Sequence, residues 1–228
     1  MSGQTILDLG VRADLAAAHE DTIADLGRPG DWMTAAERVA TVAVVRAALA
    51  DAATPEGPQP PWSQPSADHT FEPLAPAAID AAWRLTNHSG TLTADWYEAV
   101  VSELPSPEWY VEFAGVVAVT NALDRLASLL DAAVLPVVAA DGGEPRRPEI
   151  SSSTHTHWVP TAVGFEGPNV LKASTVAPTV VEMRSRIGAT HYMTPEGRAD
   201  LNYSRGTLDR RQIELVAGVT SMHNECFY

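Results

Sequence analysis

The residues best suited to redox chemistry lie near the end of the chain. Cys226 is the only cysteine, Glu214 stands twelve residues before it and His223 stands three residues before it. The thiolate is the reactive form of cysteine, and a carboxylate or an imidazole can carry the proton that a thiol releases. Residues three positions apart share a face of a helix, which would place His223 beside the thiol. Cys226, Glu214 and His223 are therefore the candidate catalytic residues.

Each candidate also has a simpler interpretation. A single cysteine can be a small, inert apolar residue. Glu214 can be a carboxylate that faces solvent, and His223 can be an ordinary surface histidine.

The other histidines offer less. His155 and His157 are two positions apart, so they would face the same way in an extended segment and could share a metal ion. No cysteine or carboxylate stands close to them in sequence, and we expect no metal site. The remaining histidines have no partner that the sequence identifies: His19, His69, His88 and His191.

Composition excludes several classes of protein. The chain has 228 residues, 45% of them hydrophobic, and a formal net charge of -14. The hydrophobic fraction is too high for a disordered chain, and one cysteine cannot form an internal disulfide. The acidic balance disfavours nucleic acid as a partner. We find no apolar run of about 18 residues and no signal peptide, so we expect no membrane association and a cytoplasmic protein.

Hydrophobic periodicity predicts an all-α fold. Prolines predict a loop over 54–76, a polar linker covers 141–153, and no βαβ alternation is present. The central helix should span 108–131, where apolar residues recur at steps of three and four with few charges. Thr34 and Glu37 form a predicted capping box. The other predicted helices span 12–26, follow Thr34, span 77–87, follow Thr93, lie near 168–192 and begin at 208 or 209.

The segment 208–228 (LDRRQIELVAGVTSMHNECFY) resembles the carboxymuconolactone decarboxylase and AhpD-like alkylhydroperoxidase superfamily. Members carry a helix that opens with Leu-Asp, a relay Glu, and a C-x-x-C pair twelve residues after that Glu. Leu208, Asp209 and Glu214 stand at matching positions. Cys226 matches the first cysteine of the pair, and the two residues after it match the spacer.

The resemblance implies a thiol or selenothiol peroxidase that reduces hydroperoxides and is reset by an external dithiol reductant, with no bound cofactor. Cys226 would be the resolving thiol and Glu214 the proton relay. The attacking residue would follow Tyr228. Some relatives carry selenocysteine there, and its codon, UGA, also reads as a stop. We therefore expect that the reading frame was cut at this codon and that the truncated chain is inactive. The alternatives are an end chosen for expression or a natural end of the chain.

A second resemblance to the same superfamily covers the first half. Residues 33–48 and 77–131 are similar to the opening and closing parts of one AhpD-like helical unit. When Leu208 is laid on Met33, Cys226 falls on Asp51, so this copy lacks a redox pair. The expected organisation is a degenerate unit over 1–140, a linker over 141–157 and an incomplete second unit over 158–228.

A different class of function is also open. Both units could be degenerate, and the chain could then be a non-catalytic helical module for self-association. A homo-oligomer is expected in either case, because an incomplete second unit would leave the apolar side of the 208–223 helix without partners.

Overall fold

The structure of the chain is a computed structural model, and it describes residues 3–51, 71–155 and 157–223. The fold is mostly helical, which confirms the prediction at that level. The helices are η1 (Ile6–Leu9), α1 (Ala13–Leu26), α2 (Ala35–Asp51), α3 (Pro76–Asn87), η2 (Ser89–Thr91), α4 (Ala94–Ser102), α5 (Pro107–Leu129), α6 (Asn169–Lys172), α7 (Pro178–His191), α8 (Pro195–Ala199) and α9 (Arg210–His223). The AhpD-like topology and the tandem copies stay predictions.

Two short antiparallel strand pairs were not predicted. β1 (Ser152–Ser153) pairs with β2 (Thr161–Ala162), and β3 (Ser204–Arg205) pairs with β4 (Leu208–Asp209). The β3–β4 turn contains Gly206 at a φ of 59°, a conformation that glycine adopts without strain. The sequence had suggested a polar connection here, and the glycine folds it into a hairpin.

Side-chain caps set the starts of several helices. Glu37 accepts a hydrogen bond from the backbone N–H of Thr34 at 2.7 Å, and the Thr34 hydroxyl accepts one from the N–H of Glu37 at 3.2 Å. This reciprocal pair is the predicted capping box of α2. The Thr93 hydroxyl caps α4 as predicted. Pro107 occupies the first turn of α5, where its missing N–H costs no hydrogen bond.

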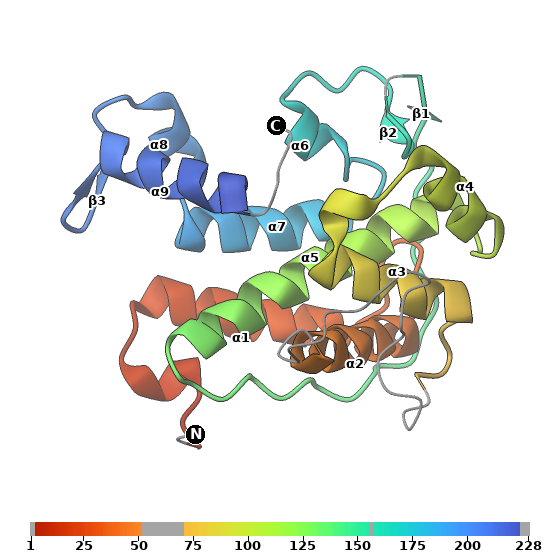
Figure 1. The fold of residues 1–228 in the computed structure, drawn as a ribbon, viewed down its shortest axis with the longest axis horizontal. Helices are drawn as coiled ribbons and strands as arrows, with labels where there is room; N and C mark the ends of the chain where they lie inside the picture. Colours follow the sequence, from red (N-terminus) through yellow and green to blue (C-terminus); the bar gives the residue numbers. More distant parts are fainter. Residues whose placement is uncertain (1–2, 52–70, 156, 224–228) are drawn as a thin grey trace.

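Helix α5 is the centre of the core, as its apolar sequence predicted. It contacts α2, α3 and α7, and it crosses the middle of the molecule in Figure 1. Thirteen of its 23 residues are buried, so water reaches little of its surface. The apolar residues of α5 that are buried are Trp109, Tyr110, Val111, Phe113, Val116, Val117, Val119, Leu123 and Ala127.

Helix α7 belongs to the same core, although it follows the predicted linker. It packs along α1 and against α5. A Cβ atom at Gly115 of α5 would lie 2.2 Å from Val180 of α7, so only glycine allows this close approach. Val180, Met183 and Ile187 are buried there. The predicted division of the chain at 141–157 stays a prediction, but the first part of the second unit shares its core with the first.

A buried ion pair ties these elements together. The Nε of Arg38 in α2 donates to Glu112 of α5 at 2.7 Å, and both side chains are at most 2% exposed. Glu112 also accepts hydrogen bonds from the backbone N–H groups of Trp32 and Met33, just before α2. Burial raises the pKa of Glu112, and the guanidinium of Arg38 opposes that rise.

The network continues into α7. Nη2 of Arg38 donates to the Thr179 hydroxyl at 2.6 Å, and that hydroxyl donates to Asp31 at 2.7 Å. The backbone N–H of Thr179 also donates to Asp31, at 2.7 Å. A Cβ atom at Gly30 would lie 1.8 Å from Glu112, so glycine is required beside the pair. Three helices and the 30–33 loop therefore meet at these buried charges.

Replacing Glu112 by glutamine should destabilise the fold strongly. The Glu112→Gln change leaves the buried Arg38 guanidinium without its counter-charge, which costs about 3–5 kcal/mol. Urea denaturation of the full chain measures this loss. The matched control is Glu98→Gln, because Glu98 is an exposed carboxylate of α4, and its cost should stay within about 0.5 kcal/mol. Equal stability of the two variants would contradict this role of the pair.

Candidate functional site

Helix α9, which carries Glu214, begins in the same way as α2. The Oε1 of Gln212 accepts a hydrogen bond from the N–H of Asp209 at 2.9 Å, and Asp209 accepts one from the N–H of Gln212 at 3.0 Å. This capping box corresponds to the Thr34–Glu37 box when Leu208 is laid on Met33. Strand β4 leads directly into the helix, so the hairpin and the box together fix where α9 starts.

Glu214 is held in a defined position at the surface. Its Oε1 accepts a hydrogen bond from Nε of Arg210, one turn earlier, at 2.8 Å. Its Oε2 accepts one from the Tyr192 hydroxyl, at 2.7 Å. The side chain is 44% exposed. The hydrogen bond from Tyr192, with the charge of Arg210 added to it, lowers the pKa of Glu214.

Arg210 and Tyr192, the two residues that donate to Glu214, are themselves held by other contacts or altered by this one. Arg210 also donates from Nη1 to the carbonyl oxygens of Gly197 and Asp200, at 2.8 and 3.0 Å, so it joins α9 to the end of α8. Burial of the Tyr192 hydroxyl, followed by its hydrogen bond to the Glu214 carboxylate, raises the pKa of Tyr192 to about 12. Glu214 is therefore an ionised carboxylate at neutral pH, and it can accept a proton most readily when the bond to Tyr192 opens.

The other two candidate residues lie further along. His223 is the last residue of α9 and is exposed. It follows Glu214 by nine positions, or about two and a half helical turns, so the two side chains leave opposite sides of α9. The structure does not bring Glu214 and His223 together. Cys226 lies outside the described residues.

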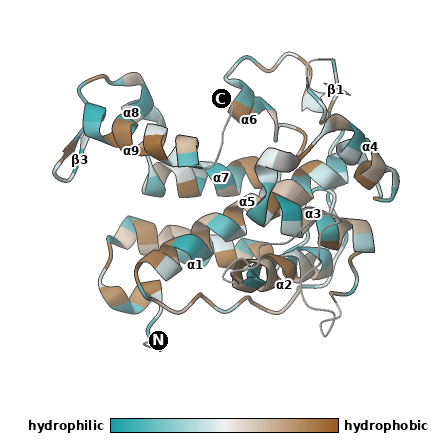
Figure 2. Ribbon diagram, in the orientation of Figure 1, coloured by the Kyte–Doolittle hydropathy of each residue, from teal (hydrophilic) through white to brown (hydrophobic). Residues whose placement is uncertain are grey.

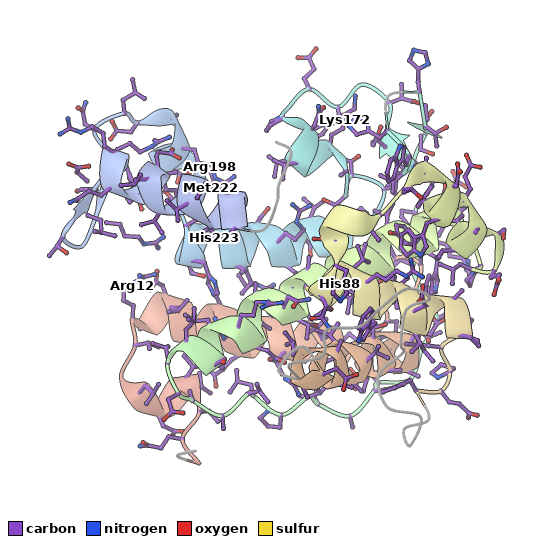
Figure 3. The ribbon with its side chains drawn as sticks, in the orientation of Figure 1. Arg12, His88, Lys172, Arg198, Met222 and His223 are labelled. Carbon is purple, nitrogen blue, oxygen red and sulfur yellow. The ribbon has the colours of Figure 1, made fainter. Side chains whose placement is uncertain are left out.

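One side of α9 presents apolar residues to solvent. Leu215, Val219 and Met222 recur at steps of four and three and are 67%, 42% and 68% exposed, and Val216 beside them is 60% exposed. Among the described residues of α9, only Ile213 is buried. Figure 2 shows the hydrophobic positions along α9, and Figure 3 labels Met222 and His223 at its end, above α7. We call Leu215, Val216, Val219 and Met222 the α9 apolar face.

Two grooves in the described part of the chain lie away from α9. One of about 500 Å³ lies between α2 and α5 and is lined by Arg46, Asp124 and Arg125 among others. Arg46 donates to both carboxylate oxygens of Asp124, at 2.8 and 3.2 Å, so their charges are already paired. Another of about 360 Å³ lies between α3 and α5. Neither groove includes Glu214 or His223.

Sequence reasoning missed the residues that hold Glu214. The four-residue step from Arg210 to Glu214 is a signal for an ion pair on a helix and could have been recognised. Tyr192 gives no such signal, because it lies 22 residues earlier and meets Glu214 only through the fold. The buried Arg38–Glu112 pair was missed for the same reason. The sequence identified no partner for His19 or His191, and the structure brings the two together.

Comparison of the chain with protein families, curated proteins and solved structures finds no match. In the part of the chain that the structure describes, no helix has both the length and the apolar character needed to cross a membrane. Across these same residues, no group of three or more histidine, cysteine or acidic side chains is arranged to hold a metal ion.

Removing the Tyr192 hydroxyl should raise the pKa of Glu214. In Tyr192→Phe the carboxylate keeps Arg210 but loses its largest stabilising contact, so the protonated form becomes relatively more favourable. Carbon NMR of the glutamate carboxyl signals as a function of pH measures this change. Tyr203→Phe is the matched control, a neighbouring tyrosine with no contact to Glu214 among those observed, and it should leave the Glu214 titration unchanged. No shift in Tyr192→Phe would show that the hydroxyl does not act on Glu214.

Proposed function

We propose that the chain carries a thiol or selenothiol peroxidase-type site of the alkylhydroperoxidase kind, centred on Cys226 with Glu214 as proton relay. The observation that carries the proposal is the spacing of Asp209, Glu214 and Cys226 along the sequence. The capping box at Asp209 and the solvent-accessible, anchored carboxylate of Glu214 support it. The similar starts of α2 and α9 support the proposal of tandem units.

The proposed chemistry balances as two thiol steps. A thiolate or selenolate attacks the outer oxygen of a hydroperoxide, the O–O bond breaks, and the products are an alcohol and a sulfenic or selenenic acid. The Cys226 thiol then attacks that oxidised atom, releasing water and forming a disulfide or a selenenyl sulfide. An external dithiol reductant restores the reduced pair by exchange.

Glu214 would serve these steps as a proton carrier. The resolving thiol must lose its proton before it attacks, and the hydroxide that leaves the oxidised atom must gain one. A carboxylate that is exposed to solvent can accept a proton when the hydrogen bond from Tyr192 opens, and it can return that proton afterwards. His223 leaves the opposite side of α9 from Glu214, so it does not join this relay and stays a candidate to assist ionisation of the Cys226 thiol.

Completing the pair should produce activity. With one cysteine appended after Tyr228, the chain should consume hydroperoxide in the presence of a dithiol reductant. In that extended chain, Cys226→Ser should abolish turnover, and Glu214→Gln should lower the rate about a hundredfold. The matched control Glu196→Gln removes an exposed carboxylate from α8 and should leave the rate unchanged. An extended chain that consumes no peroxide would refute the peroxidase proposal.

The α9 apolar face favours a second candidate function, a helical module for self-association. Four exposed apolar side chains on one side of a helix are typical of an interface, because covering them with a second apolar surface removes them from water. Each large apolar side chain contributes about 1.5–3 kcal/mol when it is fully buried. Self-association through this face is compatible with the peroxidase proposal and also with a chain that has no catalysis.

Charge on the α9 apolar face should prevent self-association. Val219→Glu places a carboxylate at the centre of the face, where burial would require its desolvation. Light scattering should show an oligomer for the unmodified chain and a monomer for Val219→Glu. The matched control is Leu201→Glu, since Leu201 is an 81% exposed apolar residue outside α9, and this variant should remain oligomeric. A monomeric unmodified chain would contradict the self-association proposal.

A further inference from the structure

A pair of histidines joins α1 to α7. His19 of α1 is 2% exposed, and its Nε2 lies 2.8 Å from Nε2 of His191, at the end of α7 and exposed. The ring centroids are 5.1 Å apart and the ring planes differ by 18°. The centroid separation nearly equals the nitrogen contact plus the radius of each ring. The imidazoles therefore meet edge to edge, with one hydrogen bond along the line between them.

This geometry suits a proton better than a metal ion. A zinc ion between two opposed nitrogens would separate them by about 4 Å, twice a Zn–N bond of about 2.0–2.1 Å. A contact of 2.8 Å is instead the length of a hydrogen bond. It requires one ring to donate and the other to accept, so at least one Nε2 must carry no proton.

The number of protons on the pair decides whether the contact can exist. A neutral pair forms the bond, and a pair with one additional proton on an outer nitrogen can still form it. When both rings are imidazolium, two N–H groups and two positive charges face each other at 2.8 Å, and the contact is lost. Burial of His19 disfavours even the first charge, and with the nearby His191 it lowers the pKa of His19 to about 4.

The charged groups around the pair add to this effect. Arg12, which precedes α1, donates to the carbonyl oxygen of Thr190 at 2.8 Å, and Arg205 of β3 donates to that of Ala189 at 2.9 Å. Burial and these two guanidinium groups lower the pKa of His191. The carboxylate of Asp14 in α1 contacts both arginines, at 2.9 and 3.7 Å.

An ion pair also joins α1 to α7. Arg186 of α7 donates to Asp25 and Thr22 of α1, at 2.8 and 3.3 Å. Arg12 and Arg205 therefore place two guanidinium groups near the pair, against the one carboxylate of Asp14. These groups carry a net positive charge, so they do not stabilise the positive charge that a proton adds to the pair.

We propose that His19 and His191 form an acid-sensitive latch that holds the C-terminal end of α7 on α1 while the pair is neutral and releases that end as protons bind. Tyr192, which holds Glu214, directly follows His191, and Arg205 binds the carbonyl oxygens of Ala189 and Tyr192. Release of the end of α7 therefore also displaces the segment from α8 to α9, which is attached to it by these contacts. The latch does not require the chemistry proposed for Cys226.

The direction of the pH effect follows from proton binding. Unfolded histidine has a pKa near 6.5, and both rings titrate lower when the latch is closed, so the open form binds more protons. The contact is at full strength above pH 6.5 and weakens as the pH falls toward 4. Opening takes up at most two protons, which raises the opening constant by up to about a hundredfold per pH unit.

Hydrogen exchange of the full chain at pH 7.5, 6 and 5, corrected for the intrinsic exchange rate, tests the latch. Protection of α7 amides should fall at least tenfold more than that of α2 and α5 between pH 6 and 5.

The variant His191→Gln tests the role of the pair. Its side-chain amide can donate a hydrogen bond to neutral His19 or, in the flipped orientation, accept one from protonated His19. Opening of α7 in this variant should therefore take up one proton fewer than in the unmodified chain. The opening constant should then change about tenfold less per pH unit. The control His155→Gln alters an exposed histidine and should behave as the unmodified chain.

Two results would overturn the latch. The first is that the protection of α7 amides does not depend on pH, or that it falls by no more than the protection of α2 and α5 amides. The other is the same pH dependence in His191→Gln as in the unmodified chain. If His191→Gln does not fold, NMR titration of the unmodified chain decides: both imidazoles must titrate below 6.5 together with α7 opening, and an ordinary titration of either ring would refute the latch.

Discussion

Arg38 carries a charge into the interior, and the surrounding elements are arranged to satisfy it. A buried guanidinium is tolerated only when a carboxylate faces it and its N–H groups find acceptors. Glu112 supplies the charge, the Thr179 hydroxyl takes one N–H group, and the carbonyl oxygen of Asp25 takes another. These partners come from α5, α7 and the end of α1. Their positions are therefore coupled, because displacement of any one leaves a buried polar group without its bond.

This coupling explains how α7 becomes part of the same core as α1, α2 and α5. Thr179, at the start of α7, lies in the polar network, and Val180 packs against Gly115 of α5. At the other end of the helix, His191 meets His19. A helix pinned at both ends is a rigid support, and α8, the β3–β4 hairpin and α9 all follow it. The position of Glu214 thus depends on contacts made by residues far from the C-terminal helix.

The C-terminal helix has the opposite character. Among its described residues, α9 buries only Ile213, and its hydrogen bonds to the rest of the chain are few and lie near the surface. Such a segment has a small free energy of local opening compared with the core. A site that exchanges protons with solvent and meets an external reductant benefits from this exposure. The α9 apolar face costs solubility unless a second surface covers it, which links the proposed chemistry to the proposed self-association.

The sequence by itself determined the helical class, most helix starts and the identity of the central helix. These features depend on nearby residues: the Thr34–Glu37 box, the cap at Thr93, Pro107 and the apolar steps of α5. It also singled out Glu214, and the four-residue spacing from Arg210 to Glu214 could have predicted their ion pair. Only the tertiary structure decided the pairing of Arg38 with Glu112, of His19 with His191, and of Tyr192 with Glu214. Each joins residues 22 to 172 positions apart, and periodicity and capping report on a few turns of chain rather than on which distant side chains meet.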